Sequence, residues 1–250
     1  MMNLFEALIL AVIQGLTEWL PISSSGHLVI LQQLLNIKAS VSFDVMLHFG
    51  TMLALVYFLR KDIVRLLKFD KKDRQLIICI VIGTVPIAIF GFIFKSFFES
   101  FFSNLFVVGL ALILNGIILY FTKFFKPSRK LGKFDAIVIG LAQVLSLVPG
   151  ISRSGITISI GLMRKLEKKE AYKFSFLLSI IAVMGANLLK FGEISFSQEP
   201  IGIVLTGVLI SALVGYLALK LITNTVLEGS FYKFSYYCWI VGAIILVLSL

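Results

Sequence analysis

The fold of this chain follows from one segment, QGLTEWLPISSSGHL, residues 14–28. It contains a glutamate, a histidine, a proline and three consecutive serines, yet the surrounding sequence is strongly apolar. Hydrocarbon offers no hydrogen-bond partners, so irregular backbone at membrane depth is tolerated only where protein or a wet cavity surrounds it. The segment therefore predicts a helix, a break and a second helix, buried inside a membrane protein.

The composition of the whole chain predicts an integral membrane protein. Of its 250 residues, 59% are hydrophobic and 14% are charged, and the mean hydropathy is +1.01. Soluble domains are about half apolar and about a quarter charged. A spanning helix needs about 20 apolar residues, and six candidates leave no room for a soluble domain, so residues 1–250 are predicted to be a single membrane domain. The candidates are residues 43–59, 76–94, 105–121, 172–189, 201–221 and 236–250.

The positive charge is concentrated in loops. The formal net charge is +10, and 19 of the 23 Lys and Arg residues lie in 60–74, 123–133, 164–173 and a later loop with Lys220 and Lys233. Six spans place these loops on one side, which the positive-inside rule makes cytoplasmic. Both termini and the loop 191–200 are then outside, in a multi-pass protein of the plasma membrane. This distribution favours contacts with anionic membrane lipids over nucleic-acid binding.

The opening segment has a second copy. FEALILAVIQGLTEWLPISSSG (5–26) aligns without a gap over FDAIVIGLAQVLSLVPGISRSG (134–155), and the two share the glutamine and the S-x-S-G. Two repeats follow, about 1–128 and 129–250, each with one interrupted stretch and three spans. Because three is odd, the halves should have opposite orientation. We therefore predict an all-α polytopic protein with inverted-topology repeats, each a re-entrant helix hairpin plus three transmembrane helices.

The aligned copies differ at three chemically informative positions. Glu18 aligns with Leu147, Ser24 with Arg153, and His27 with Ile156. One copy thus supplies an acid, a serine and an imidazole, while the other supplies a guanidinium. Ionisable residues inside a membrane are costly and point to function. The differences predict one asymmetric polar pocket instead of two equal ones.

The breaks also predict an anion site. Each ends in S-x-S-G immediately before a helix, where free N–H groups and the helix dipole favour an anion. The planar fork of Arg153 matches phosphate oxygens. The predicted phosphate-binding residues are Arg153, Ser23, Ser25, Gly26, Ser152, Ser154 and Gly155.

Phosphoryl transfer is the chemistry that this combination favours. Ser24 is a candidate nucleophile, and Glu18 or His27 is its candidate base; with Arg153 they form the predicted catalytic set. In the membrane, the phosphate is expected to be attached to a lipid. Alternatively, Glu18 or His27 activates water and Ser24 only binds phosphate.

Several of these side chains also have a structural interpretation. Ser23 and Ser25 are typical N-cap residues, Glu18 could pair with Arg153 purely structurally, and His27 could be a satisfied core histidine. Gln14 lies one turn before Glu18 and has its counterpart in Gln143, so both are predicted to be supporting residues. His48 and Asp44, at the start of the first span, are interpreted as interfacial polar residues.

The motifs resemble those of the undecaprenyl-diphosphate phosphatase family, also called bacitracin-resistance phosphatases. They are QGLTE (14–18), PISSSGH (21–27) and PGISRSG (149–155), with GTVPIAIFGFIFK (83–95) and GYLALK (215–220) extending the resemblance over essentially the whole chain. The resemblance implies removal of the terminal phosphate from a C55 polyprenyl diphosphate. It also implies recycling of the carrier lipid for cell-wall precursors, bacitracin resistance, and an active site that opens outward.

The paired-acid motif of that family maps onto Gln14 and Glu18, so this chain departs from members with two acids. A carboxylate beside a diphosphate is repulsive unless a cation bridges them, so Mg²⁺ or Ca²⁺ is expected, with Glu18 as its ligand. No organic cofactor is expected. The expected partners are the polyprenyl diphosphate, membrane lipids and a second copy in a homodimer. The alternative from another class is an inverted-repeat transporter that flips a polyprenyl phosphate.

Overall fold

The computed structural model describes residues 2–37, 39–191 and 199–249, and every named element in that part of the chain is a helix, apart from one isolated β-bridge between Arg129 and Leu166. Six helices are long and apolar enough to cross a membrane, which confirms the predicted polytopic all-α fold. Short helices connect some of them: α4 (Arg60–Leu66), α6 (Lys95–Glu99) and η1 (Ser100–Ser103). The crossing helices are α3 (Val41–Phe58), α5 (Arg74–Ile93), α7 (Leu105–Phe121) extended by η2 (Thr122–Phe124), α10 (Lys168–Phe191), α11 (Ile201–Glu228), and η4 (Phe231–Lys233) with α12 (Phe234–Leu248).

The two interrupted stretches form helical hairpins. The first consists of α1 (Leu4–Trp19) and α2 (Ser24–Leu34). The second consists of α8 (Lys133–Gln143), η3 (Val144–Leu147) and α9 (Arg153–Met163). In each hairpin the two α-helices contact one another. The first break begins at Leu20, whose extended backbone (φ −68°, ψ 148°) is the conformation favoured before a proline.

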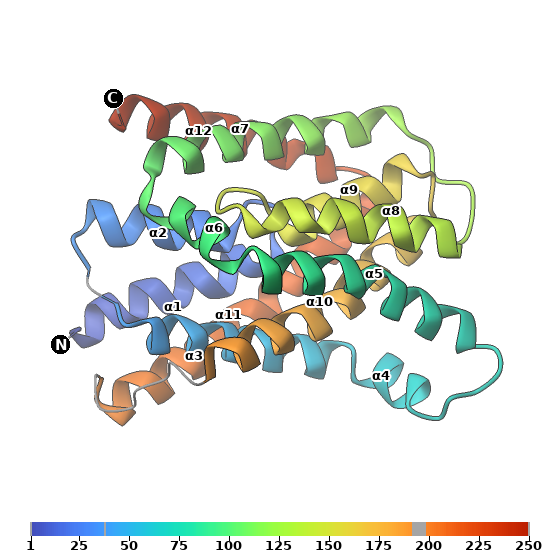
Figure 1. Ribbon diagram of the computed structural model, residues 1–250, viewed down its shortest axis with the longest axis horizontal. Helices are drawn as coiled ribbons and strands as arrows, with labels where there is room; N and C mark the ends of the chain where they lie inside the picture. Colours follow the sequence, from blue (N-terminus) through green and yellow to red (C-terminus); the bar gives the residue numbers. More distant parts are fainter. Residues whose placement is uncertain (1, 38, 192–198, 250) are drawn as a thin grey trace.

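The ends of the molecule differ in the way that the charge pattern predicts. Figure 1 shows that α1 begins and α12 ends at the same end, whereas the basic connections after α4, α7 and α9 gather at the opposite end. The α1–α2 hairpin enters from the first end and the α8–α9 hairpin from the second. This arrangement is consistent with inverted repeats. Residues 192–198, most of the loop predicted to be outside, are not among the described residues.

Helix packing follows the same symmetry. The alignment makes α1 equivalent to α8 and α11 equivalent to α5; α1 packs on α11, and α8 packs on α5. Glycine permits the second of these contacts to be close, since a Cβ on Gly140 would lie 2.5 Å from the carbonyl oxygen of Gly83. Small residues at helix crossings are typical of membrane proteins. These contacts hold both hairpins against long spanning helices.

Asn115 of α7 ties the two breaks together. Its buried side-chain NH₂ donates to the carbonyl oxygen of Pro21 (2.8 Å), and its Oδ1 accepts from the N–H of Ser152 (3.1 Å). The amide thus satisfies one backbone group from each hairpin. The breaks are therefore fixed to one another inside protein, as the absence of water at membrane depth requires.

Candidate active site

A cluster of polar side chains surrounds the carboxylate of Glu18 in the last turn of α1. The Glu18 side chain is only 3% exposed. Its Oε2 accepts hydrogen bonds from the Ser24 hydroxyl (2.6 Å) and from Nε2 of Gln14 (3.0 Å). Its Oε1 accepts a hydrogen bond from the guanidinium of Arg153. The fold thus brings a hydroxyl and a guanidinium from different repeats to a single carboxylate.

Each hairpin contributes the first residue of its second helix. Ser24 begins α2 and Arg153 begins α9, and these are the aligned positions at which the repeats differ. The remaining donors of Arg153 are poorly used: one terminal nitrogen lies 3.5 Å from the carbonyl oxygen of Ser179, and the buried Nε has no partner among the described residues. The guanidinium therefore retains donors for an anion.

The start of each of these helices offers backbone N–H groups to an anion as well. Within the described part of the chain, the amides of Ser24 and Ser25 in α2 and of Arg153 and Ser154 in α9 have no acceptor. The predicted glycine amides are already used, because Gly26 donates to Ser23 Oγ and Gly155 donates to Ser152 Oγ at the two caps. The unfilled donors are thus the helix-start amides, which favour anions.

The repeated serines make contacts within the protein. Ser23 Oγ accepts from the amide of Gly150 (3.0 Å), and Ser154 Oγ donates to the carbonyl oxygen of Trp19 (3.1 Å). Ser152 Oγ lies 3.4 Å from the carbonyl oxygen of Leu20, and Ser25 Oγ lies 3.3 Å from Ser23 Oγ. Most of these bonds cross between the hairpins. They give the repeated hydroxyls a structural task, while phosphate binding by them stays a prediction.

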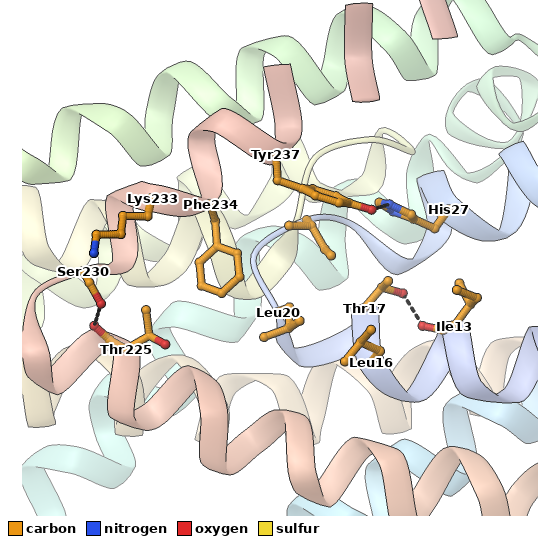
Figure 2. A pocket seen from close by; sticks show the side chains of 11 residues that line it. Ile13, Leu16, Thr17, Leu20, His27, Thr225, Ser230, Lys233, Phe234 and Tyr237 are labelled. Atoms are coloured by element: carbon orange, nitrogen blue, oxygen red, sulfur yellow. Dashed lines mark hydrogen bonds between the residues drawn. The ribbon is translucent and has the colours of Figure 1, made fainter. Parts of the chain in front are cut away.

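His27 lies outside the Glu18 cluster. Its Nδ1 is 2.8 Å from the carbonyl oxygen of Ser23, and its Nε2 is 2.7 Å from the Tyr237 hydroxyl. The ring also lines a mostly apolar cavity of about 480 Å³ that reaches Lys233 (Figure 2). Glu18, Ser24 and Arg153 do not line this cavity. A catalytic role of His27 therefore stays a prediction, and the geometry here is that of a histidine joining α2 to α12.

His48 is the residue whose position the sequence did not reveal. The sequence predicts an interfacial polar residue, but His48 Nδ1 lies 3.2 Å from Glu18 Oε2 and 2.9 Å from Gln14 Nε2. The sequence contained one signal for His48: like Glu18, it is an ionisable group inside the membrane protein, and such groups point to function. Asp44, on the preceding turn of α3, is instead bound by the side chain of Gln32 (3.0 and 3.1 Å).

The two aligned glutamines have opposite surroundings. Gln14 donates to Glu18 and lies beside His48, whereas the fully buried Gln143 has no partner for either amide atom in the described structure. Their shared sequence position therefore does not produce a shared hydrogen-bond pattern.

The cluster does not fit a protein-held metal ion. The Glu18 carboxylate already lies within bonding distance of Ser24, Gln14, His48 and Arg153, and the guanidinium occupies the place of a cation. No group of three His, Cys, Asp or Glu able to hold an ion is found among the described residues. The prediction that Glu18 binds a divalent ion is untested, and these contacts do not favour it.

Comparison with known proteins places this geometry in a defined family context. A family model described as "Bacitracin resistance protein BacA" matches residues 7–244. Proteins named undecaprenyl-diphosphatase are similar over nearly their full length. The one from Carboxydothermus hydrogenoformans is 44% identical over 99% of this chain and 98% of its own. Those from Korarchaeum cryptofilum and Halothermothrix orenii are 40% and 38% identical, over 99% of this chain and 100% and 99% of their own.

Proposed function

This chain belongs to the bacitracin resistance protein BacA family, and from that premise we propose that it cleaves a polyprenyl diphosphate with Ser24 as the nucleophile. Its activity is that of an undecaprenyl-diphosphatase, which converts the diphosphate to polyprenyl phosphate and inorganic phosphate. The observation that carries the mechanism is the position of Glu18 between the Ser24 hydroxyl and the Arg153 guanidinium.

Substrate binding begins with Arg153 in this proposal. Its unfilled donors and the free amides that begin α2 and α9 can bind the terminal phosphate, whose oxygens match the planar fork of a guanidinium. When the phosphate takes Arg153, Glu18 is left with the Ser24 hydroxyl as a close donor at 2.6 Å. The anion thus prepares the base that acts on the nucleophile.

The chemical step transfers the phosphoryl group to Ser24. The Oγ–H bond breaks and its proton passes to Glu18 Oε2, while Oγ forms a bond to the terminal phosphorus. The bond between that phosphorus and the bridging oxygen breaks, and polyprenyl phosphate leaves with the electron pair. Water then hydrolyses the phosphoserine, which releases inorganic phosphate and restores the hydroxyl. Arg153 and the helix-start amides stabilise the charge that develops on the phosphoryl oxygens.

Trapping of the intermediate tests this mechanism. Substrate labelled in the terminal phosphate is mixed with purified protein in detergent, the reaction is quenched with acid, and the label on the protein is counted. Wild type and Ser25→Ala should retain label, and Ser24→Ala should not. A Ser24→Ala variant that still turns over rapidly would contradict the serine mechanism and favour attack by activated water. Because no bilayer is present, phosphate release in this assay also separates hydrolysis from lipid transport.

The membrane arrangement is part of the proposal. The protein is a multi-pass membrane protein, and we place it in the plasma membrane with both termini outside and the active site opening outward. The basic connections gather at the end opposite to the termini, and the positive-inside rule makes that end cytoplasmic. This distribution supports the proposed orientation. Labelling of single cysteines in the connections 60–74 and 123–133 should place both on the cytoplasmic side. Opposite sides would contradict the arrangement.

Two further expectations remain proposals. Because the Glu18 contacts leave no site for an ion, a divalent cation would be held mainly by the diphosphate oxygens, as Mg²⁺ often is. A homodimer is the proposed assembly, and the mass of the protein in detergent tests it.

A further inference from the structure

The set of Ser24, Glu18 and Arg153 leaves His48 unexplained. This residue lies 30 positions after Glu18 in the sequence, on the spanning helix α3, which packs against α1. Its Nδ1 is directed at the same carboxylate oxygen, Glu18 Oε2, that accepts the Ser24 hydrogen bond. An imidazole at this position shares the atom that receives the proton in the proposed mechanism.

The hydrogen bonds around His48 allow a resting state in which Nδ1 is free to accept a proton. Gln14 Nε2 has two hydrogens, one directed at Glu18 Oε2 (3.0 Å) and one at His48 Nδ1 (2.9 Å). In the tautomer in which Nδ1 accepts that hydrogen, Nδ1 is unprotonated and the ring proton is on Nε2. Nδ1 can also lie against Glu18 Oε2 at 3.2 Å, and there it would donate if it carried a proton. Nδ1 therefore has a donor, Gln14, when it is unprotonated and an acceptor, Glu18, when it is protonated.

We infer that His48 is a positioning residue that receives, through Glu18, the proton which Ser24 gives up. The inference rests on the proposed serine mechanism. As the Oγ–P bond forms, the Ser24 proton moves to Glu18 Oε2 and then to His48 Nδ1, so that Glu18 is again a carboxylate and His48 is an imidazolium. Polyprenyl phosphate leaves with its electron pair. In the hydrolysis step, the proton lost by the attacking water returns to Ser24 Oγ by way of Glu18.

Exposure explains why the proton should finish on His48. The His48 side chain is 29% exposed, compared with 3% for Glu18, so the imidazolium is accessible from outside the cluster. His27 lacks this opportunity because both of its ring nitrogens are engaged, by Ser23 and Tyr237. Residence of the proton on His48 also keeps Glu18 from remaining neutral beside the cation of Arg153.

The other charged groups around α3 leave this assignment intact. From α1 the group that faces His48 is Glu18, which carries Arg153 of α9 on its other oxygen. From α2, Gln32 binds Asp44 of α3. On α10 and α11, the titratable groups with described contacts near α3 lie toward the C-terminal end of α3. There Lys173 of α10 binds Asp62 of α4, and Tyr216 of α11 lies against Tyr57 of α3.

The test is the substitution His48→Asn. The asparagine amide occupies nearly the position of Nδ1, so it can accept from Gln14 or donate to Glu18, but it cannot take up a proton. Phosphate release is measured from about pH 5 to pH 8, the range in which histidine titrates. Because the substrate phosphate titrates there too, wild type and variant are compared on the same substrate. His48→Asn should lower kcat by about 10²-fold, change KM little, and remove the acid limb of the wild-type profile, because asparagine cannot take up a proton.

A merely structural role predicts a different result. If His48→Asn keeps the wild-type kcat and acid limb, the inference is wrong, while the proposed function stands as long as Ser24→Ala is inactive. Should Ser24→Ala retain a tenth or more of the activity, the proposed mechanism fails, and with it the inference that depends on it. If the asparagine variant does not elute as a folded protein, His48→Gln is measured in its place, with the same expected loss of the acid limb.

Discussion

The α1–α2 hairpin and the α8–α9 hairpin have similar helix caps at their breaks, but they present different ionisable and polar side chains there. In both, a serine caps the second helix by accepting from a glycine amide three residues later: Ser23 from Gly26 and Ser152 from Gly155. The first hairpin then presents Ser24 where the second presents Arg153, and it carries an acid, Glu18, where the second has Leu147.

This difference separates structural residues from candidate chemical ones. Residues that occur in both copies make the turns and join the breaks, as Ser23 does with the amide of Gly150 and Ser154 with the carbonyl oxygen of Trp19. Two residues that occur in one copy, Ser24 and Arg153, meet at the Glu18 carboxylate. His27 and Gln14 are exceptions, since the unrepeated His27 lies outside the cluster and the repeated Gln14 contacts Glu18. Two similar hairpins thus build one asymmetric site. The following substitutions test that separation, beginning with the largest expected effect.

Replacement of the unrepeated serine should have the largest effect. Ser24→Ala is expected to lower turnover by about 10³-fold or more, the scale of nucleophile removal. Ser25→Ala, the matched change at the adjacent repeated position, should cost much less. Both are measured as phosphate release from a polyprenyl diphosphate. Similar losses in the two variants would erase the distinction between repeated and unrepeated serines.

Arg153→Lys tests the unrepeated residue of the second hairpin. An ammonium keeps the charge and loses the planar fork, so kcat/KM should fall by about 10- to 100-fold, which corresponds to one or two charge-assisted hydrogen bonds. The thermal unfolding temperature should stay close to that of wild type. Full activity with Lys would mean that Arg153 serves only as the ion-pair partner of Glu18.

The aligned glutamines give a matched pair across the hairpins. Gln14→Leu removes donors that Glu18 and His48 use and should lower kcat/KM by about tenfold. Gln143→Leu removes a buried amide that has no partner among the described residues, so activity should be unchanged and the unfolding temperature equal or higher. The comparison fails if the two substitutions lower activity equally.

The smallest expected effect is on stability alone. Ser154→Ala removes the hydroxyl that binds the carbonyl oxygen of Trp19 in the other hairpin. The free energy of unfolding should fall by about 1 kcal/mol, typical of one hydrogen bond, which is seen as a slightly lower unfolding temperature in detergent. A large loss of turnover in folded Ser154→Ala would instead favour a role of this serine in phosphate binding.

Local patterns in the sequence were sufficient for the architecture. Apolar length predicts six spans, because a bilayer fixes the length of a helix that crosses it, and the structure confirms them. The Pro–Ser break predicts an interruption between two helices, and in the structure residues 20–23 separate the end of α1 from the start of α2. The alignment at an offset of 129 also identifies Ser24 and Arg153 as opposed positions, and both contact Glu18.

Tertiary packing alone decided which other side chains reach the carboxylate. His27 is three residues from Ser24, yet its ring is bound by Ser23 and Tyr237; His48 is far away in sequence and lies against Glu18. Asn115, inconspicuous in an apolar helix, holds both breaks. Periodicity and caps depend on neighbours within a few residues, so the sequence reveals them. The rotation and offset of α3 against α1, and of α7 against both breaks, depend on side-chain packing over the whole molecule, and these set the contacts of His48 and Asn115.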